Sequence, residues 1–258
     1  MIGFGVPLAA LAMIVIGGAL LSYVAKMRRN RSDLRPVNEQ LAAAAAILLA
    51  TAAFFQQPGI LGALIAVVAI VPAGLFLVAI YTSREPAQPP NMHIGELAPD
   101  FAGVAADGTP FRLSALRGQP VLLKFFRGLW CPYCIAELKE LAALAPNFEA
   151  LGVKLVAVSS DSPAEIARVE ARRRWPIALV ADQSLEAHRS YNVQRRHFAP
   201  RRGPFRELAI PTTVLIGADG RVQWFVQSRD HRVRPHADWV LGMIIPFLSK
   251  RPRPALAA

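Results

Sequence analysis

The chain divides into an apolar front part and a mixed remainder. Residues 1–83 hold only seven charged side chains, whereas from residue 84 onward charged and apolar positions are interspersed as in a water-soluble domain. Three apolar stretches, at about 2–25, 41–57 and 60–81, lie in the front part. A helix of about 20 apolar residues crosses the ~30 Å hydrocarbon core of a bilayer. The middle stretch is shorter and needs flanking residues to span, so the pattern predicts a membrane anchor of two or three transmembrane helices.

The positive charges of the front part bear on its orientation. Five of them crowd the first loop, namely Lys26, Arg28, Arg29, Arg31 and Arg35. The positive-inside rule places such a loop in the cytoplasm. Three spans of a bacterial-type inner membrane then leave the remainder of the chain in the cytoplasm, and two spans leave it in the periplasm. A cleavable signal peptide is disfavoured, because these charges follow the first apolar stretch instead of preceding it.

Beyond the anchor, the pattern predicts a linker and one α/β domain. Residues 84–94 contain Pro86, Pro89 and Pro90 and form a short, stiff linker. Residues 95–250 alternate short apolar runs with amphipathic segments, which is typical of a mixed sheet flanked by helices. Residues 251–258 form a tail. The predicted strands are 121–126, 153–158, 177–181, 212–216 and 222–227, and the predicted helices are 131–151, 162–174, 185–191 and 236–248.

The net charge of +11 raises the question of an anionic partner. No nucleic-acid recognition motif accompanies the charge, so nucleic acid is not expected as a partner. One basic stretch stands out within the domain, and we interpret it as an inserted, solvated loop, with contact to anionic lipid or an acidic partner as the alternative. It contains Arg195, Arg196, Arg201, Arg202 and Arg206.

The chemistry is concentrated in the only two cysteines, Cys131 and Cys134. Their spacing closes almost no loop, which excludes a disulfide framework. Zinc needs about four ligands, and the five histidines are scattered, so no metal site is predicted. No phosphate-binding or dinucleotide fingerprint is present, so no cofactor is expected. A redox-active dithiol is the interpretation that remains.

The residues around the pair favour Cys131 as the nucleophile. It stands where a predicted strand ends and a helix begins, and the helix dipole stabilises a thiolate there. Pro132 suits the first helical position. Trp130 is expected to pack beside the sulfur, and Arg127 to add positive charge. Cys134, one turn later, is the expected resolving partner.

Several segments resemble one known family. Residues 95–101 (GELAPDF), 113–118 (LSALRG) and 126–134 (FRGLWCPYC) are similar to the alkyl hydroperoxide reductase/thiol-specific antioxidant (AhpC/TSA) branch of the thioredoxin superfamily, and residues 161–163 and 230–235 to its peroxiredoxin-like members. Residues 210–213 (IPTT) resemble the cis-proline loop that lies against the redox cysteine, which implies a cis bond before Pro211. The resemblance implies a thioredoxin-like fold and reduction of hydroperoxides through a sulfenic acid and an internal disulfide, which a thioredoxin-like or other dithiol reductant returns to the dithiol.

One departure from that family leaves the roles of the cysteines open. Peroxiredoxins carry Thr or Ser three residues before a single peroxidatic cysteine, whereas here Cys131 occupies that place before Cys134. In the favoured assignment Cys131 attacks the peroxide and Cys134 resolves, because the first sulfur of such a pair is normally the more exposed and acidic. In the alternative assignment Cys134 is the peroxidatic cysteine. Arg127, Arg232 and Arg234 are candidates to polarise the peroxide.

The function has two further interpretations besides a membrane-anchored thiol peroxidase. A tethered thioredoxin-like thiol-disulfide oxidoreductase uses the same cysteines on protein disulfides, and a location outside the cytoplasm favours it. A redox sensor would show oxidisable cysteines without turnover.

Overall fold

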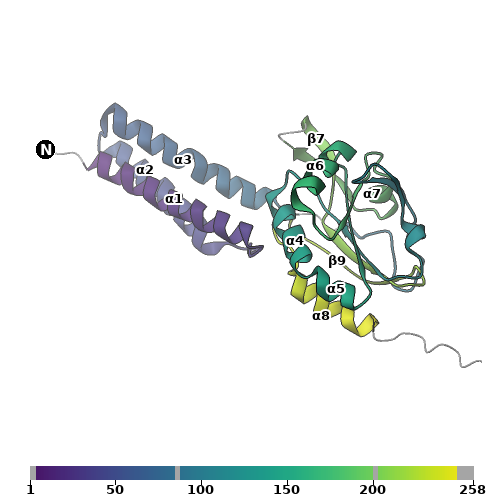
Figure 1. The fold of residues 1–258 in the computed structure, drawn as a ribbon. Coiled ribbons are helices and arrows are strands. Elements are labelled where there is room, and N and C mark those ends of the chain that lie inside the picture. Colours follow the sequence, from purple (N-terminus) through teal and green to yellow (C-terminus); the bar gives the residue numbers. More distant parts are fainter. Residues whose placement is uncertain (1–3, 85–87, 200–202, 249–258) are drawn as a thin grey trace, which may run out of the picture. The chain divides into compact units, whose positions relative to one another are not determined.

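The computed structural model describes residues 4–84, 88–199 and 203–248 (Figure 1). Side chains of residues 197–206 are outside the description, as are residues 249–258, which contain the predicted tail. The chain forms two compact units, Met1–Arg84 and Glu85–Ala258.

The first unit consists of three helices, α1 (Gly5–Arg28), α2 (Val37–Phe55) and α3 (Gly59–Thr82). All three are long and apolar enough to cross a membrane. The middle helix begins four residues before the predicted apolar stretch and reaches 19 residues. These flanking residues add Glu39, which is buried and accepts hydrogen bonds from Ser22 Oγ at 3.0 Å and Lys26 Nζ at 2.9 Å. The charge of Glu39 in the added turn is therefore balanced by Lys26.

Small side chains line the contacts between these helices. Fully buried alanines occur in each helix, and a Cβ on Gly5 of α1 would lie 2.8 Å from Cα of Pro58, the N-cap of α3. Small residues let helix backbones approach closely, and packing of this kind drives association where no water is present to be released. The buried alanines are Ala9 and Ala12 in α1, Ala43, Ala46, Ala50 and Ala53 in α2, and Ala66, Ala69 and Ala73 in α3.

The second unit contains a seven-stranded mixed sheet of order β2-β1-β5-β4-β3-β8-β9. The central strands β3, β4 and β5 are parallel, and the outer pairings are antiparallel. This is the predicted thioredoxin-like arrangement. The strands are β1 (Ala102–Ala105), β2 (Pro110–Arg112), β3 (Val121–Phe125), β4 (Lys154–Ser159), β5 (Ala178–Ala181), β8 (Thr212–Ile216) and β9 (Val222–Gln227).

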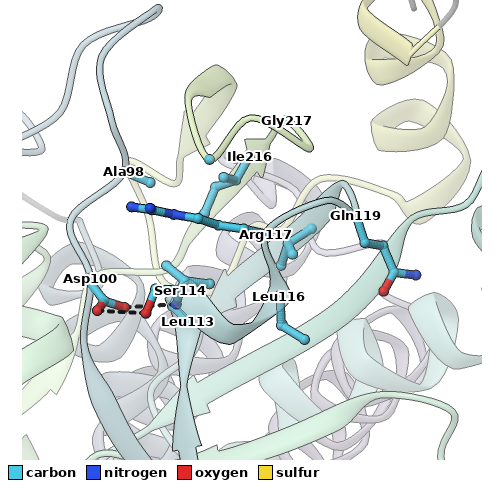
Figure 2. A pocket seen from close by; sticks show the side chains of 11 residues that line it. Ala98, Asp100, Leu113, Ser114, Leu116, Arg117, Gln119, Ile216 and Gly217 are labelled. Carbon is cyan, nitrogen blue, oxygen red and sulfur yellow. Dashed lines mark hydrogen bonds between the residues drawn. The ribbon is translucent and has the colours of Figure 1, made fainter.

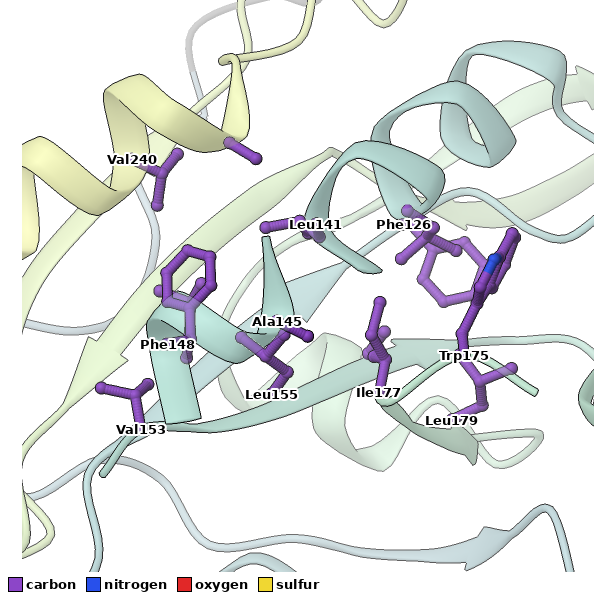
Figure 3. Packing of buried hydrophobic residues seen from close by; sticks show 14 of the residues in the cluster. Phe126, Leu141, Ala145, Phe148, Val153, Leu155, Trp175, Ile177, Leu179 and Val240 are labelled. Carbon is purple, nitrogen blue, oxygen red and sulfur yellow. The ribbon is translucent and has the colours of Figure 1, made fainter. Parts of the chain in front are cut away.

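Helices cover both faces of this sheet. On one face, α4 (Pro132–Ala143), α5 (Ala145–Ala150), α6 (Pro163–Arg173) and α8 (Ala237–Leu248) bury a large apolar cluster that includes both cysteines. Figure 3 shows Phe148 of α5, Val240 of α8 and Leu155 of β4 among the residues of this cluster. On the other face, α7 (Glu186–Ser190) and the 3-10 helix η1 (Leu113–Leu116) pack against a second cluster around Phe125 and Tyr191. The redox cysteines therefore lie on one defined face of the sheet.

Several local expectations are confirmed and others are wrong. The helix predicted at 162–174 is confirmed as α6, and Ser162 and Glu165 form the reciprocal capping bonds that start it. The predicted helix 131–151 is broken at Leu144, because Pro146 lacks the N–H that a continuous helix requires at that turn. The short strands β1 and β2, at one end of the sheet, were not predicted, since each has only three or four residues and no clear alternation.

The basic stretch predicted as a loop is a β-hairpin. Strands β6 (Gln194–Ala199) and β7 (Gly203–Ala209) pair antiparallel, with a register shift between His197 and Ala199. The arginines hid the strand pattern, because these two strands carry charged residues in place of the apolar run or clean alternation that predicts a strand. Residues 200–202, with Arg201 and Arg202, lie outside the described residues.

The end of the predicted linker is bound to the domain surface. Gln88 Nε2 donates to the carbonyl oxygens of Asn192 at 2.9 Å and Gln194 at 3.1 Å, and Asn91 N–H donates to Tyr191 O. Residues 85–87, with Pro86, lie outside the description.

Candidate redox site

The cysteine pair stands at the junction between β3 and α4. Cys131 is the N-cap of α4 with an extended backbone, Pro132 opens the helix, and Cys134 follows on its first turn. Both cysteines are free. Strand β3, in the centre of the sheet, ends just before the cysteines, so the pair lies at the carboxyl edge of the parallel strands. The N-terminus of α4 is directed at Cys131.

A buried carboxylate holds the loop before the cysteines. Asp161 Oδ2 accepts from Leu129 N–H at 2.7 Å and from Ser159 Oγ at 2.8 Å. Within this loop Gly128 has a φ of +148°, and a Cβ there would lie 2.4 Å from Trp130 Nε1. Only glycine fits this backbone beside the indole, so the approach to Cys131 is sterically determined.

The two thiols have different electrostatic environments. The pKa of Cys131 is lowered to about 6, because the Cys134 thiol donates a hydrogen bond to its sulfur and the charges of Arg234 and Arg127 outweigh the opposing effect of burial. The pKa of Cys134 is raised, first by burial and then by the neighbouring Cys131 thiolate. Cys131 is therefore the more acidic sulfur. Exposure does not distinguish the two sulfurs as expected, because Cys131 is 1% and Cys134 0% exposed.

Arg127 and Trp130 lie together beside the pair. The Arg127 guanidinium is 5.5 Å from the centre of the Trp130 ring, and Arg127 is buried. Within the described residues, Arg127 Nε and Trp130 Nε1 have no hydrogen-bond partner although both atoms are buried. Buried donors of this kind are costly unless something accepts from them.

A second arginine reaches the resolving sulfur from the segment before α8. Arg234 Nη2 donates to Cys134 Sγ at 3.4 Å, and Arg234 Nε lies 3.6 Å from Glu137 Oε2. The other oxygen of Glu137 forms an ion pair with Lys124 Nζ at 2.5 Å, and Lys124 also donates to Thr213 Oγ1 at 3.0 Å. Lys124, Glu137 and Arg234 are each at most 4% exposed, and we call these three residues the charged cluster.

The remaining predicted residues have other surroundings. Arg232 is ion-paired with the buried Asp230 at 2.6 Å. Pro211 is buried and immediately precedes β8, where Thr212 pairs with Phe125 at the end of β3, so it lies at the same edge of the sheet as the cysteines. The expected cis bond is wrong, since the described residues contain no cis peptide bond. The trans form is the intrinsically favoured one, and here Ile210 N–H reaches Val193 O without a cis turn.

Sequence reasoning named Arg234 as a candidate but missed Lys124, Glu137 and the role of Asp161. A signal for Lys124 was present, because it is the one charge in the apolar run 121–126. Glu137 stands three residues after Cys134, on the same side of α4. Nothing in the sequence indicates that these two side chains meet Arg234, which is about 100 residues away.

The small pocket in Figure 2 is separate from the cysteines. Asp100, Ser114, Arg117 and Gly217 line it, and Asp100 accepts from Ser114 N–H and Oγ. It lies where β3 begins and β8 ends, whereas the cysteines follow the end of β3. Its volume of about 20 Å³ suits a water molecule and no substrate. Among the described residues no group of His, Cys, Asp or Glu has the arrangement of a metal site.

A thioredoxin-like fold with a free C-x-x-C pair at the start of a helix defines a thiol oxidoreductase. Comparison with known proteins narrows the class. The model of the AhpC/TSA family matches residues 94–225, about half of the chain. The chain belongs to the AhpC/TSA family.

The individual relatives include both thiol-disulfide oxidoreductases and peroxiredoxins. The thiol-disulfide oxidoreductase ResA of Geobacillus kaustophilus is 31% identical over 134 residues, which cover 52% of this chain and 68% of that protein. Peroxiredoxin 2 of Thermoplasma acidophilum is 34% identical over 140 residues, 52% of this chain and 65% of that protein. Among solved structures, peroxidoxin BcpB of Mycobacterium tuberculosis aligns with a TM-score of 0.52 and 27% identity, over 60% of this chain and 97% of that one.

Proposed function

We propose that the chain is a membrane-anchored thiol peroxidase that reduces hydroperoxides through Cys131 and Cys134. The observation that carries the proposal is the acidic Cys131 beside unsatisfied buried donors. Arg127 and Arg234 both lower the pKa of this sulfur, and Arg127 Nε, Trp130 Nε1 and Arg234 Nη1 lack hydrogen-bond partners among the described residues. Donors preorganised around a nucleophile stabilise the charge that moves onto the departing oxygen of a peroxide.

The proposed reaction has two steps at these sulfurs. The Cys131 thiolate attacks one peroxide oxygen, so that an S–O bond forms, the O–O bond breaks and an alkoxide leaves and is protonated. Cys134 then attacks the sulfenic sulfur, the S–S bond forms and hydroxide leaves as water. An external thioredoxin-like or other dithiol reductant returns the disulfide to the dithiol.

Burial of the sulfur favours a peroxide over a protein disulfide. Cys131 is 1% exposed, with the partly buried Trp130 and Tyr133 packed against the same apolar cluster. A hydroperoxide needs only room for two oxygens at the sulfur, whereas a protein disulfide must bring its own backbone to within bonding distance. The similarity to ResA supports thiol–disulfide exchange as the second candidate.

The test compares the two substrates on the same protein. The fully reduced, full-length chain in detergent micelles is mixed in a stopped-flow instrument with hydrogen peroxide, an organic hydroperoxide or a reducible protein disulfide, and Trp fluorescence is followed. We expect oxidation by peroxide far faster than that of a free thiol. Cys131→Ser should abolish it, whereas Cys134→Ser should still react once and stop at the sulfenic acid. Peroxide oxidation at the free-thiol rate beside rapid exchange with the protein disulfide would establish the second candidate instead.

We further propose that all three helices span the membrane, with the redox unit in the cytoplasm. The length of α2 supports three spans, and the basic loop after α1 supports a cytoplasmic loop. Fusions after Arg84 to a reporter active only in the cytoplasm and to one active only outside test this. Activity of the cytoplasmic reporter is expected, with the opposite reporter as the control. Activity of the external reporter would contradict the three-span topology.

A further inference from the structure

The charged cluster beneath the cysteines contains one cation more than it has anions. Arg234 and Lys124 are positive and Glu137 is negative, and all three are buried. The Cys131 thiolate supplies the missing negative charge while the protein is reduced. A disulfide has no charge, so oxidation leaves one buried cation without a counter-charge. An uncompensated charge in the protein interior is strongly unfavourable.

Lys124 is the group that can remove this imbalance. A guanidinium stays protonated under all ordinary conditions, so Arg234 does not lose its charge. A buried lysine loses its proton readily: burial lowers the pKa of Lys124 and outweighs the opposing charge of Glu137, and the charge of Arg234 adds to the lowering. The groups that act on Lys124 are Glu137 and Cys134 of α4 and Arg234. Its neighbours on the adjoining strands, Ala157 of β4 and Thr213 of β8, do not titrate.

The proton that Lys124 loses is the one that the proposed reaction lacks. Starting from one thiolate and one thiol, reduction of a hydroperoxide to alcohol and water consumes one additional proton. Glu137 is bound to Lys124 through Oε1, while Oε2 has no hydrogen-bond partner among the described residues and faces Arg234, which donates to Cys134 Sγ. It is placed to pass a proton from Lys124 toward the reacting sulfurs.

We infer that Lys124 is an internal proton store: it gives up one proton through Glu137 when the Cys131–Cys134 disulfide forms, and regains it on reduction. Cys131 thiolate, Cys134 thiol, protonated Lys124 and ROOH become the disulfide, neutral Lys124, ROH and water. Atoms and charge balance without a proton from solvent. Lys124 touches neither substrate nor sulfur and is therefore a positioning residue that acts through Glu137. The inference rests on the proposed dithiol cycle but not on the choice of peroxide as substrate, since exchange with a disulfide lacks the same proton.

The test counts protons. The reduced, full-length protein in detergent, weakly buffered at about pH 7.5, where Cys131 is a thiolate, is oxidised with excess hydrogen peroxide while an indicator dye reports proton uptake. Ultraviolet absorbance of the same sample reports the thiolate lost. The wild type should lose one thiolate per disulfide and take up no proton, whereas Lys124→Met should take up about one. Lys139→Met, on the exposed side of α4, is the matched control and should behave as the wild type.

Two outcomes would overturn the inference. One is uptake of one proton per disulfide by the wild type, and the other is no uptake by Lys124→Met, which would place the proton source elsewhere. If Lys124→Met does not fold, Lys124→Met/Glu137→Gln removes both charges of the ion pair and should also take up about one proton.

A second measurement separates this inference from the choice of substrate. The oxidation equilibrium against dithiothreitol should not change between about pH 7 and 8 in the wild type, and should fall about tenfold per pH unit in Lys124→Met. Slow oxidation by peroxide with these results would refute the peroxidase and leave the proton store intact. Fast oxidation by peroxide, together with a wild-type oxidation equilibrium that falls tenfold per pH unit, would support the peroxidase and refute the proton store.

Discussion

The hydrogen bond from Cys134 is the largest contribution to the low pKa of Cys131, and its removal can be measured. Cys134→Ala deletes the donor, whereas Cys134→Ser replaces the thiol with a hydroxyl that still donates. A hydrogen bond to a charged group contributes about 1.5–3 kcal/mol, and one pKa unit corresponds to about 1.4 kcal/mol. The pKa of Cys131 should therefore rise from about 6 to about 7–8 in Cys134→Ala and stay near 6 in Cys134→Ser.

Ultraviolet absorbance of the thiolate between about pH 4 and 10 gives this pKa without requiring access to the buried sulfur. At pH 7 a pKa of about 6 corresponds to about 90% thiolate, and a pKa of about 7–8 to about 10–50%. Both variants hold a single cysteine, so the titration belongs to Cys131 alone. If Cys134→Ala titrates within about half a unit of Cys134→Ser, the reasoning is refuted and the arginine charges hold the thiolate by themselves.

The same pKa has a consequence for stability, with a defined sign. The pKa of Cys131 is about 6 in the folded protein, below the ~8.5 of an unfolded cysteine, so the thiolate stabilises the fold above the unfolded value and this is lost as pH falls through about 6. The 2.5-unit difference corresponds to about 3 kcal/mol at most. Thermal unfolding of Cys134→Ser at about pH 8.5 and pH 5.5 measures it, with Cys131→Ser/Cys134→Ser as the control that subtracts every other titrating group. An equal pH response of the two proteins would contradict the low pKa.

Two further predictions concern the loop before Cys131. Gly128→Ala should destabilise the redox unit by about 2–4 kcal/mol in thermal unfolding, because the added Cβ overlaps Trp130 at a strained backbone angle. The control Gly152→Ala, at a position with a positive φ and open space around it, should cost about 1 kcal/mol. Equal losses of stability would show that the indole moves aside freely. Asp161→Ala leaves Leu129 N–H without its acceptor and should cost about 2–3 kcal/mol in thermal unfolding, and an unchanged melting temperature would show that solvent replaces the carboxylate.

Much of the redox unit could be predicted because its determinants are local. The strands 121–126 and 153–158 are apolar runs with a single lysine each, close to the pattern of buried parallel strands, and the capping pair Ser162 and Glu165 marks the start of α6 within four residues. Cys131 could be singled out because a strand-to-helix junction with Pro132 at the first helical position places a helix N-terminus at that sulfur.

Where the predictions were wrong, partners from distant segments decided the outcome. The arginine-rich hairpin is held by pairing between β6 and β7, which no alternation of apolar residues reveals. The bond before Pro211 is trans although its sequence resembles a cis-proline loop, because isomer choice depends on the surrounding backbone and not on the dipeptide.

The sequence by itself determined the class of chemistry: two cysteines on one helical turn, after a buried strand, in a chain with three apolar segments. Only the tertiary structure decided the electrostatics. Folding brings Arg234 to within 3.4 Å of Cys134, about 100 residues away in the sequence. It also places Glu137 against both Arg234 and Lys124. The physical reason is that secondary structure follows from neighbours along the chain, whereas the pKa of a buried thiol follows from the charges that folding places around it.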